Sequence, residues 1–160
     1  LRTLWGIYRE EKPGSALVEE VAARWQKALP LMDAELKDLG AKALQRADRE
    51  LNGLTVPCGI MHGDFVSWNI RVDGTRMFIF DWESAAWEAP LSWDFFHFQV
   101  QTACCLGKGE DLRSPFSDGR SDSASLLLYL LSSLCEFVQK PVSRGVGVSY
   151  RKRILCRELS

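Results

Sequence analysis

The sequence lacks a long apolar run. Its most hydrophobic stretch, Leu126 to Leu134, includes two serines, whereas a membrane-spanning helix needs roughly 20 apolar residues. The first eleven residues contain no apolar segment with a cleavage site, so a signal peptide is not expected either. Charge of one sign is also missing, because 20 Lys and Arg balance 21 Asp and Glu. We therefore expect no membrane partner and no nucleic-acid partner.

A disulfide framework is equally absent. The five cysteines are odd in number, Cys104 and Cys105 are adjacent, and the spacing fits no metal motif. This pattern favours a reducing, cytoplasmic location. The basic residues gather late in the chain, where we expect a solvated tail. They are Arg144, Arg151, Lys152, Arg153 and Arg157.

What is present is enough for a folded domain: 160 residues, 46% hydrophobic and 11% aromatic. Apolar periodicity predicts helices over about 15–29, 33–51, 92–106 and 125–139. Ser15 is the expected cap of the first helix, and Asp122 or Ser123 that of the last. Gly40 weakens the second helix. Residues 109–120 read as a loop, and 142–160 carry no clear pattern.

Strands are predicted over Ile70–Val72 and Met77–Phe80, with Asp73-Gly74 as the hairpin turn. Two strands do not make a self-sufficient sheet. The expected fold class is therefore α+β and mainly helical, a single domain over residues 1–160 with this hairpin packed on helices.

Three side chains flank the hairpin. Asn69 precedes its first strand, Asp81 follows its second, and Asp64 lies five residues before Asn69. Antiparallel pairing brings the ends of the two strands together. Oxygen ligands of this kind suit Mg²⁺ with substrate phosphates, and a free carboxylate beside the metal can accept a proton. The constellation therefore predicts phosphoryl transfer.

The segments HGDFVSWNI and FIFDWESA carry a resemblance. The spacing from His62 to Asn69 matches the kinase catalytic loop H-R-D-x-x-x-x-N, and Asp81 stands at the place of the metal-binding aspartate. This sequence resembles the aminoglycoside phosphotransferase and choline kinase family, and its segment WEAPLSWDFFHF is similar to the stretch after the aspartate in that family.

The resemblance implies a protein-kinase-like C-terminal lobe that uses ATP and Mg²⁺. It implies Asp64 as the catalytic base and Asn69 and Asp81 as the metal ligands, with His62 and Asp94 supporting the loop. The implied acceptor is a hydroxyl of an aminoglycoside-like, amino-alcohol or sugar molecule. The residues before Pro57 read as helices without a glycine-rich loop, so the N-terminal nucleotide lobe is expected to be absent.

Two other functions remain open from the sequence. The chain could be a truncated, non-catalytic kinase-like remnant that acts as a scaffold or binding module. It could also be a metal-dependent hydrolase that uses His62, Asp64 and His97, although His97 fits better as a core or boundary histidine.

Aromatic and acidic residues near the motif leave a further choice. The four tryptophans of this region are expected mainly in the core and its rim, with a stacking platform as the alternative. They are Trp68, Trp82, Trp87 and Trp93. Trp87, Glu88 and the acidic residues of 109–122 could face a cationic or polyol substrate.

Overall fold

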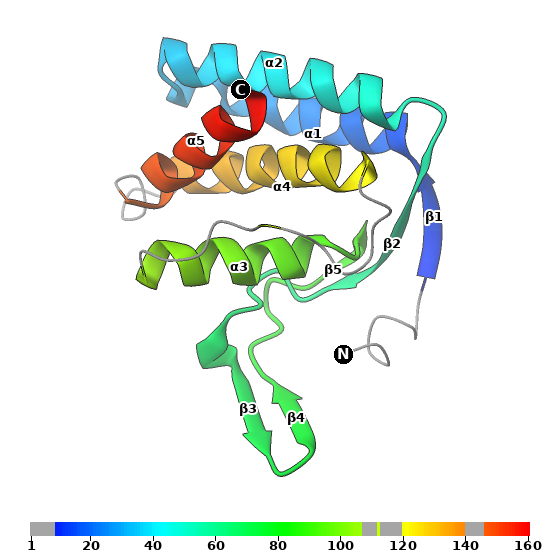
Figure 1. Cartoon of the computed structure of the whole chain (residues 1–160), viewed down its shortest axis with the longest axis vertical. Coiled ribbons are helices and arrows are strands. Elements are labelled where there is room, and N and C mark those ends of the chain that lie inside the picture. Colours follow the sequence, from blue (N-terminus) through cyan, green and yellow to red (C-terminus); the bar gives the residue numbers. More distant parts are fainter. Residues whose placement is uncertain (1–8, 107–111, 113–119, 140–145) are drawn as a thin grey trace. The chain divides into compact units, whose positions relative to one another are not determined.

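A computed structural model describes residues 9–106, 112, 120–139 and 146–160 (Figure 1). The chain divides into two compact units. One contains Leu1–Glu11 and Pro57–Phe116, and the other contains Lys12–Val56 and Ser117–Ser160. Two of the three boundaries between the units fall inside β1 (Arg9–Pro13) and β2 (Thr55–Met61).

The described residues of the second unit form a bundle of four α-helices. They are α1 (Gly14–Ala28), α2 (Ala34–Leu51), α4 (Arg120–Gln139) and α5 (Val146–Leu159). A short 3₁₀ turn, η1 (Leu29–Leu31), follows α1. All three other helices pack against α4, and every residue of α4 from Ala124 to Cys135 is buried. The three helices that periodicity predicts in this unit are therefore confirmed as α1, α2 and α4, and α4 is the centre of this core.

Two predicted helix caps are wrong. Helix α1 starts at Gly14 directly after Pro13, and no side chain caps it, so Ser15 lies inside the helix. Helix α4 starts at Arg120, which places Asp122 and Ser123 inside its first turns. Asp33 caps α2, because its Oδ1 accepts the Leu36 N–H at 2.7 Å. That backbone N–H, together with Lys152, lowers the pKa of Asp33 below its usual value.

Gly40 has a packing role in the middle of α2. A Cβ at this position would lie 2.0 Å from Cζ2 of Trp25, whose side chain is almost completely buried. The missing side chain lets the indole of α1 lie against the α2 backbone. The close packing of α1 on α2 therefore offsets the lower helix propensity of glycine.

The expectation of a solvated basic tail is wrong. Residues 146–159 form α5, and Arg151 is fully buried in it. Its Nε donates to Ser133 Oγ at 2.6 Å, and its guanidinium lies 4.0 Å from the centre of the Phe137 ring. A guanidinium tolerates burial when hydrogen-bond acceptors and an aromatic face surround it. Lys152 pairs with Glu35 at 2.7 Å, which raises the pKa of the lysine. Arg144 lies outside the described residues.

The first unit contains strands that the sequence did not reveal. A three-stranded sheet has the order β1-β2-β5, with β5 at Ala86–Pro90 antiparallel to β2. Pro57 and Gly59 interrupt β2 in sequence, yet the Pro57 carbonyl accepts the Leu91 N–H at 3.1 Å. A proline at a position where only its carbonyl is needed does not break a sheet.

The predicted hairpin is present as β3 (Ile70–Asp73) and β4 (Arg76–Ile79). Because Asp73 pairs with Arg76, the turn is Gly74-Thr75, one residue later than predicted. The expected packing of the strands on helices is wrong: the hairpin projects away from α3 (Trp93–Leu106) in Figure 1. Val72 is accordingly 71% exposed.

Within the part of the chain that the structure describes, no helix is both long and apolar enough to cross a membrane. All five cysteines are free. The mainly helical α+β class is confirmed, whereas the single domain and its identity as a kinase C-terminal lobe stay predictions.

Candidate active site

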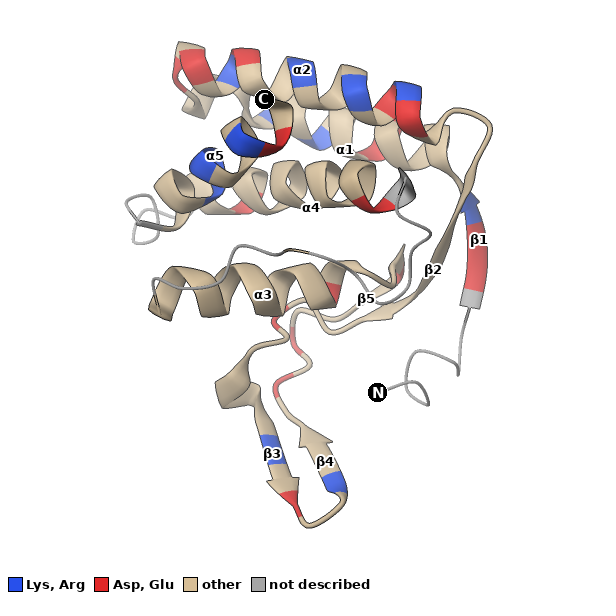
Figure 2. Cartoon of the chain, in the orientation of Figure 1, with Lys and Arg blue, Asp and Glu red and all other residues tan. Residues whose placement is uncertain are grey.

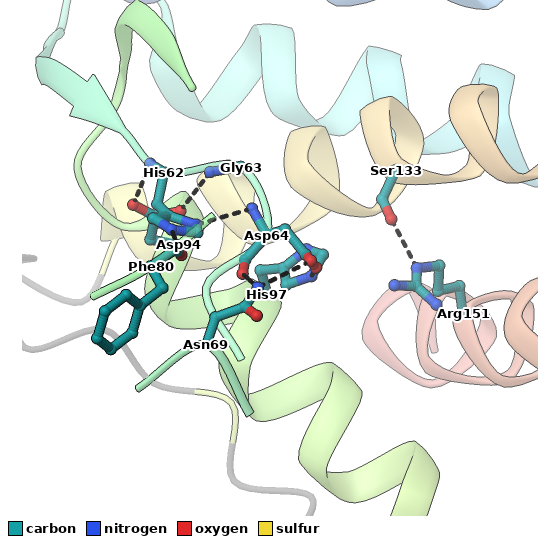
Figure 3. Close-up of polar contacts among 9 residues, drawn as sticks. All are labelled: His62, Gly63, Asp64, Asn69, Phe80, Asp94, His97, Ser133 and Arg151. Atoms are coloured by element: carbon teal, nitrogen blue, oxygen red, sulfur yellow. Dashed lines mark hydrogen bonds and ion pairs between the residues drawn. The ribbon is translucent and has the colours of Figure 1, made fainter. Parts of the chain in front are cut away.

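The candidate site is built on the loop between β2 and β3, and α3 holds the start of this loop (Figure 3). The backbone N–H of His62 donates to Asp94 Oδ2 at 2.7 Å, and that of Gly63 donates to Asp94 Oδ1 at 3.0 Å. Asp94 is 3% exposed and lies in the first turn of α3. One buried carboxylate therefore fixes two consecutive peptide groups of the loop. The charged residues of this region are coloured in Figure 2.

Gly63 is required at its position for two reasons. Its φ is +83°, a conformation that side chains disfavour. A Cβ would also lie 2.2 Å from the carbonyl oxygen of Ser84. The loop thus passes directly against the backbone that comes after Asp81, and only glycine fits there.

His62 joins the two halves of the site through its imidazole. The Asp64 backbone N–H donates to Nδ1 at 3.2 Å, so Nδ1 is the acceptor and Nε2 carries the proton. Nε2 then donates to the Phe80 carbonyl at 2.7 Å. The ring is 1% exposed, and the Trp82 ring packs on it at 4.6 Å. Both nitrogens are used, so His62 is a structural link.

Asp64 and Asn69 are brought into direct contact. Asn69 Nδ2 donates to the Asp64 carbonyl oxygen and to Asp64 Oδ2, both at 3.0 Å. Asn69 is buried, whereas the Asp64 side chain is 39% exposed. The amide thus closes the loop and leaves the carboxylate open to a substrate. Because both contacts use Nδ2, the carbonyl oxygen of the Asn69 side chain points elsewhere.

Asp81 lies two residues after Ile79, the last residue of β4. The Phe80 N–H donates to the Asn69 carbonyl at 2.9 Å, and the Phe80 carbonyl accepts from His62. Asp81 itself is exposed and has a φ of +64°. Asp is among the few residues that tolerate this left-handed conformation, and strain of this kind often accompanies a functional site. Asn69 and Asp81 therefore flank the same end of the hairpin along the chain, and Asp64 contacts Asn69.

His97 lies closer to the site than its sequence pattern predicts. Its Nε2 lies 3.3 Å from Asp64 Oδ1, and its side chain is 13% exposed. The sequence spacing of Asp94 and His97 could have indicated this position. The two residues are three apart, and residues at this spacing share one face of a helix. Its partner, however, is 33 positions earlier in the chain, which no local pattern reveals.

The donor set suits a hard cation. The Asp81 carboxylate and the Asn69 amide oxygen are the ligand types that Mg²⁺ accepts, with phosphates and water completing the shell. Among the described residues, no group of three or more His, Cys, Asp and Glu side chains could hold a metal. The hydrolase site of His62, Asp64 and His97 is therefore contradicted, since His62 has no nitrogen left for a metal.

The four tryptophans near the motif differ in how far they are exposed. Trp93 is buried in the core, as expected. Trp68 is 55% exposed and Trp87 is 71% exposed, so neither serves mainly as core packing. Trp82 is 38% exposed and covers His62. Of the acidic loop at 109–122, residues 109–111 and 113–119 lie outside the described residues.

Comparison with known protein families gives a match over most of the chain. The family model APH, described as the phosphotransferase enzyme family, matches residues 6–121. This range covers well over half of the chain and includes the whole site from His62 to His97. No curated protein and no solved structure matches the chain significantly.

Proposed function

Because the chain belongs to the phosphotransferase enzyme family, the family that its motifs resemble, we propose that it is a small-molecule kinase. It transfers the γ-phosphoryl group of ATP to a hydroxyl of an aminoglycoside-like, amino-alcohol or sugar acceptor. The observation that carries the proposal is the Asp64 carboxylate, which Asn69 holds by a hydrogen bond and which stays 39% exposed to solvent.

Asp64 acts as the base in this proposal. Its exposed carboxylate accepts the hydrogen bond of the acceptor hydroxyl and takes the proton as the oxygen attacks phosphorus. The new oxygen–phosphorus bond forms as the bond to the departing ADP oxygen breaks. Asn69 contributes by fixing the carboxylate, because its Nδ2 binds one carboxylate oxygen and the backbone of the same residue.

Asp81 and the Asn69 amide oxygen would hold Mg²⁺, which neutralises charge on the phosphate oxygens when bound. The chain prepares this pair through backbone contacts. Phe80 is bonded to Asn69 on one side and to His62 on the other, so the peptide before Asp81 cannot drift from the loop. Positioning of this kind is the main contribution of a protein to phosphoryl transfer.

Supporting residues make the arrangement rigid. Asp94 binds the loop backbone and His62 links Asp64 to Phe80. A reducing, ATP-supplied compartment such as the cytoplasm fits this chemistry and the five free cysteines.

The first experiment is a calorimetric titration with a non-hydrolysable ATP analogue, with and without Mg²⁺. It uses this chain and the full open reading frame that encodes it. We expect Mg²⁺-dependent binding and phosphorylation of a member of the acceptor panel. Absence of nucleotide binding by both proteins would instead support the non-catalytic scaffold.

The matched variants are Asp64→Ala and Asp73→Ala. Asp64→Ala removes the base and should abolish turnover while nucleotide binding is kept. Asp73 is an exposed carboxylate at the hairpin turn, and its loss should leave both unchanged. Undiminished turnover in Asp64→Ala contradicts the proposal.

A further inference from the structure

We propose that His97 is a positioning residue that orients the Asp64 carboxylate toward the acceptor hydroxyl. The inference rests on the proposed function for its catalytic meaning. The contact between the two side chains can be tested without that function.

The carboxylate of Asp64 is approached from two directions. Asn69 Nδ2 lies 3.0 Å from Oδ2, and His97 Nε2 lies 3.3 Å from Oδ1 (Figure 3). A carboxylate with one anchored oxygen still rotates about its terminal bond, which is a broad torsion. A second contact, on the other oxygen, restricts that rotation. His97 and Asn69 together thus fix the orientation of the Asp64 carboxylate.

The exposed fractions of the two side chains agree with this role for His97. The Asp64 side chain is 39% exposed, whereas that of His97 is 13% exposed. The acceptor hydroxyl therefore reaches the carboxylate from the solvent side, while the imidazole contacts it from the shielded side. His97 itself does not need to touch the substrate.

Helix α3 provides the rigid base for both anchors of the loop. Asp94 and His97 lie three residues apart on one face of this helix. Asp94 binds the backbone of residues 62 and 63, and His97 meets the side chain of residue 64. The Phe65 and Phe98 rings, with centroids 5.8 Å apart, pack against each other and add a contact between loop and helix. A site held by a helix is positioned more precisely than one held by a loop alone.

The contact can be measured by ¹⁵N NMR of the imidazoles, because the chain has only two histidines. Histidine-labelled wild type and Asp64→Ala are compared. We expect the His97 Nε2 signal to shift in the variant. The His62 signals should stay in place, because its Nδ1 contacts the backbone N–H of Asp64, which the substitution keeps. Unchanged His97 signals overturn the proposal.

The kinetic arm compares three variants on the same helix. His97→Leu removes the polar contact with Asp64 and should lower kcat between about 10- and 100-fold, with the KM of nucleotide and acceptor unchanged, as expected for a misplaced group. His97→Gln keeps an N–H near the Nε2 position and should recover kcat to within about threefold of wild type. Thr102→Val is the control, and its kinetics should equal those of wild type.

The outcomes separate this proposal from the proposed function. A shifted His97 signal in a protein without any turnover confirms the contact and contradicts the kinase assignment. Wild-type kcat in His97→Leu, in an active enzyme, overturns the positioning role. An equal loss in His97→Leu and His97→Gln, accompanied by a lower melting temperature, also overturns it, because the residue then serves packing alone.

Discussion

The Asp94→Asn substitution tests the central support of the candidate site. Asp94 accepts the backbone N–H groups of His62 and Gly63 at 2.7 and 3.0 Å. Asparagine has nearly the same shape but keeps only one oxygen. One peptide N–H then faces the N–H groups of the new amide, and the loop loses part of its tie to α3.

The free-energy cost of Asp94→Asn depends on how deeply the lost hydrogen bond is buried. Asp94 is 3% and His62 is 1% exposed, so water cannot replace the lost bond. A hydrogen bond to a charged group contributes about 1.5–3 kcal/mol, and leaving a buried donor unpaired adds to the cost. We expect a loss on the order of 3 kcal/mol for the loop. Asp94→Ala would remove both bonds. The resulting loss of stability would approach the total stability of a small domain, which is about 5–15 kcal/mol. The milder variant is chosen for this reason.

The assay is hydrogen exchange of individual amides by NMR. The loss corresponds to about a 100-fold faster exchange of the His62 and Gly63 amides, since about 1.4 kcal/mol equals a factor of ten. Asp73→Asn, at the exposed hairpin turn, is the control and should change stability by less than about 0.5 kcal/mol. Exchange at His62 and Gly63 within about threefold of wild type would refute the reasoning.

Two further predictions concern the helical unit. Gly40→Ala should gain about 1 kcal/mol of helix propensity but lose about 1–3 kcal/mol through overpacking, because its Cβ would meet the buried Trp25 ring at 2.0 Å. Urea unfolding should show net destabilisation, and a stabilised variant would contradict the close contact. Asp33→Ala should cost about 1 kcal/mol near neutral pH through loss of the cap. Because folding lowers the pKa of Asp33, this contribution is present above its unfolded pKa and is lost as the pH falls through the folded one. Unfolding near pH 7 and about pH 2.5 should therefore give a smaller difference in acid, and an equal difference at both values would contradict the assigned role.

Local patterns predicted the elements whose contacts are local. The apolar spacing of α1, α2 and α3 reports a face that must be buried, and the structure confirms these helices. The hairpin was also predictable, because turn residues between two β-rich segments specify it. Its turn was misplaced by one residue, since both Asp73 and Gly74 suit such positions.

Long-range contacts formed the elements that were missed. Strand β5 has no alternating pattern and forms because β2 provides a partner edge. Arg151 looked like a surface residue, yet Ser133 and Phe137 on a neighbouring helix make its burial possible. The sequence around a residue does not indicate which residue of another helix or strand will contact it.

The motif segments alone were enough to predict the family, because the fixed intervals between Asp64, Asn69 and Asp81 around a hairpin lie in one stretch of sequence. The chemistry assigned to these three residues stays a prediction. How those groups are held became visible only in the folded chain. Asp94 and His97 reach the loop from a helix some 30 residues later in the chain. That approach depends on the packing of α3 against the loop, which chain spacing does not encode.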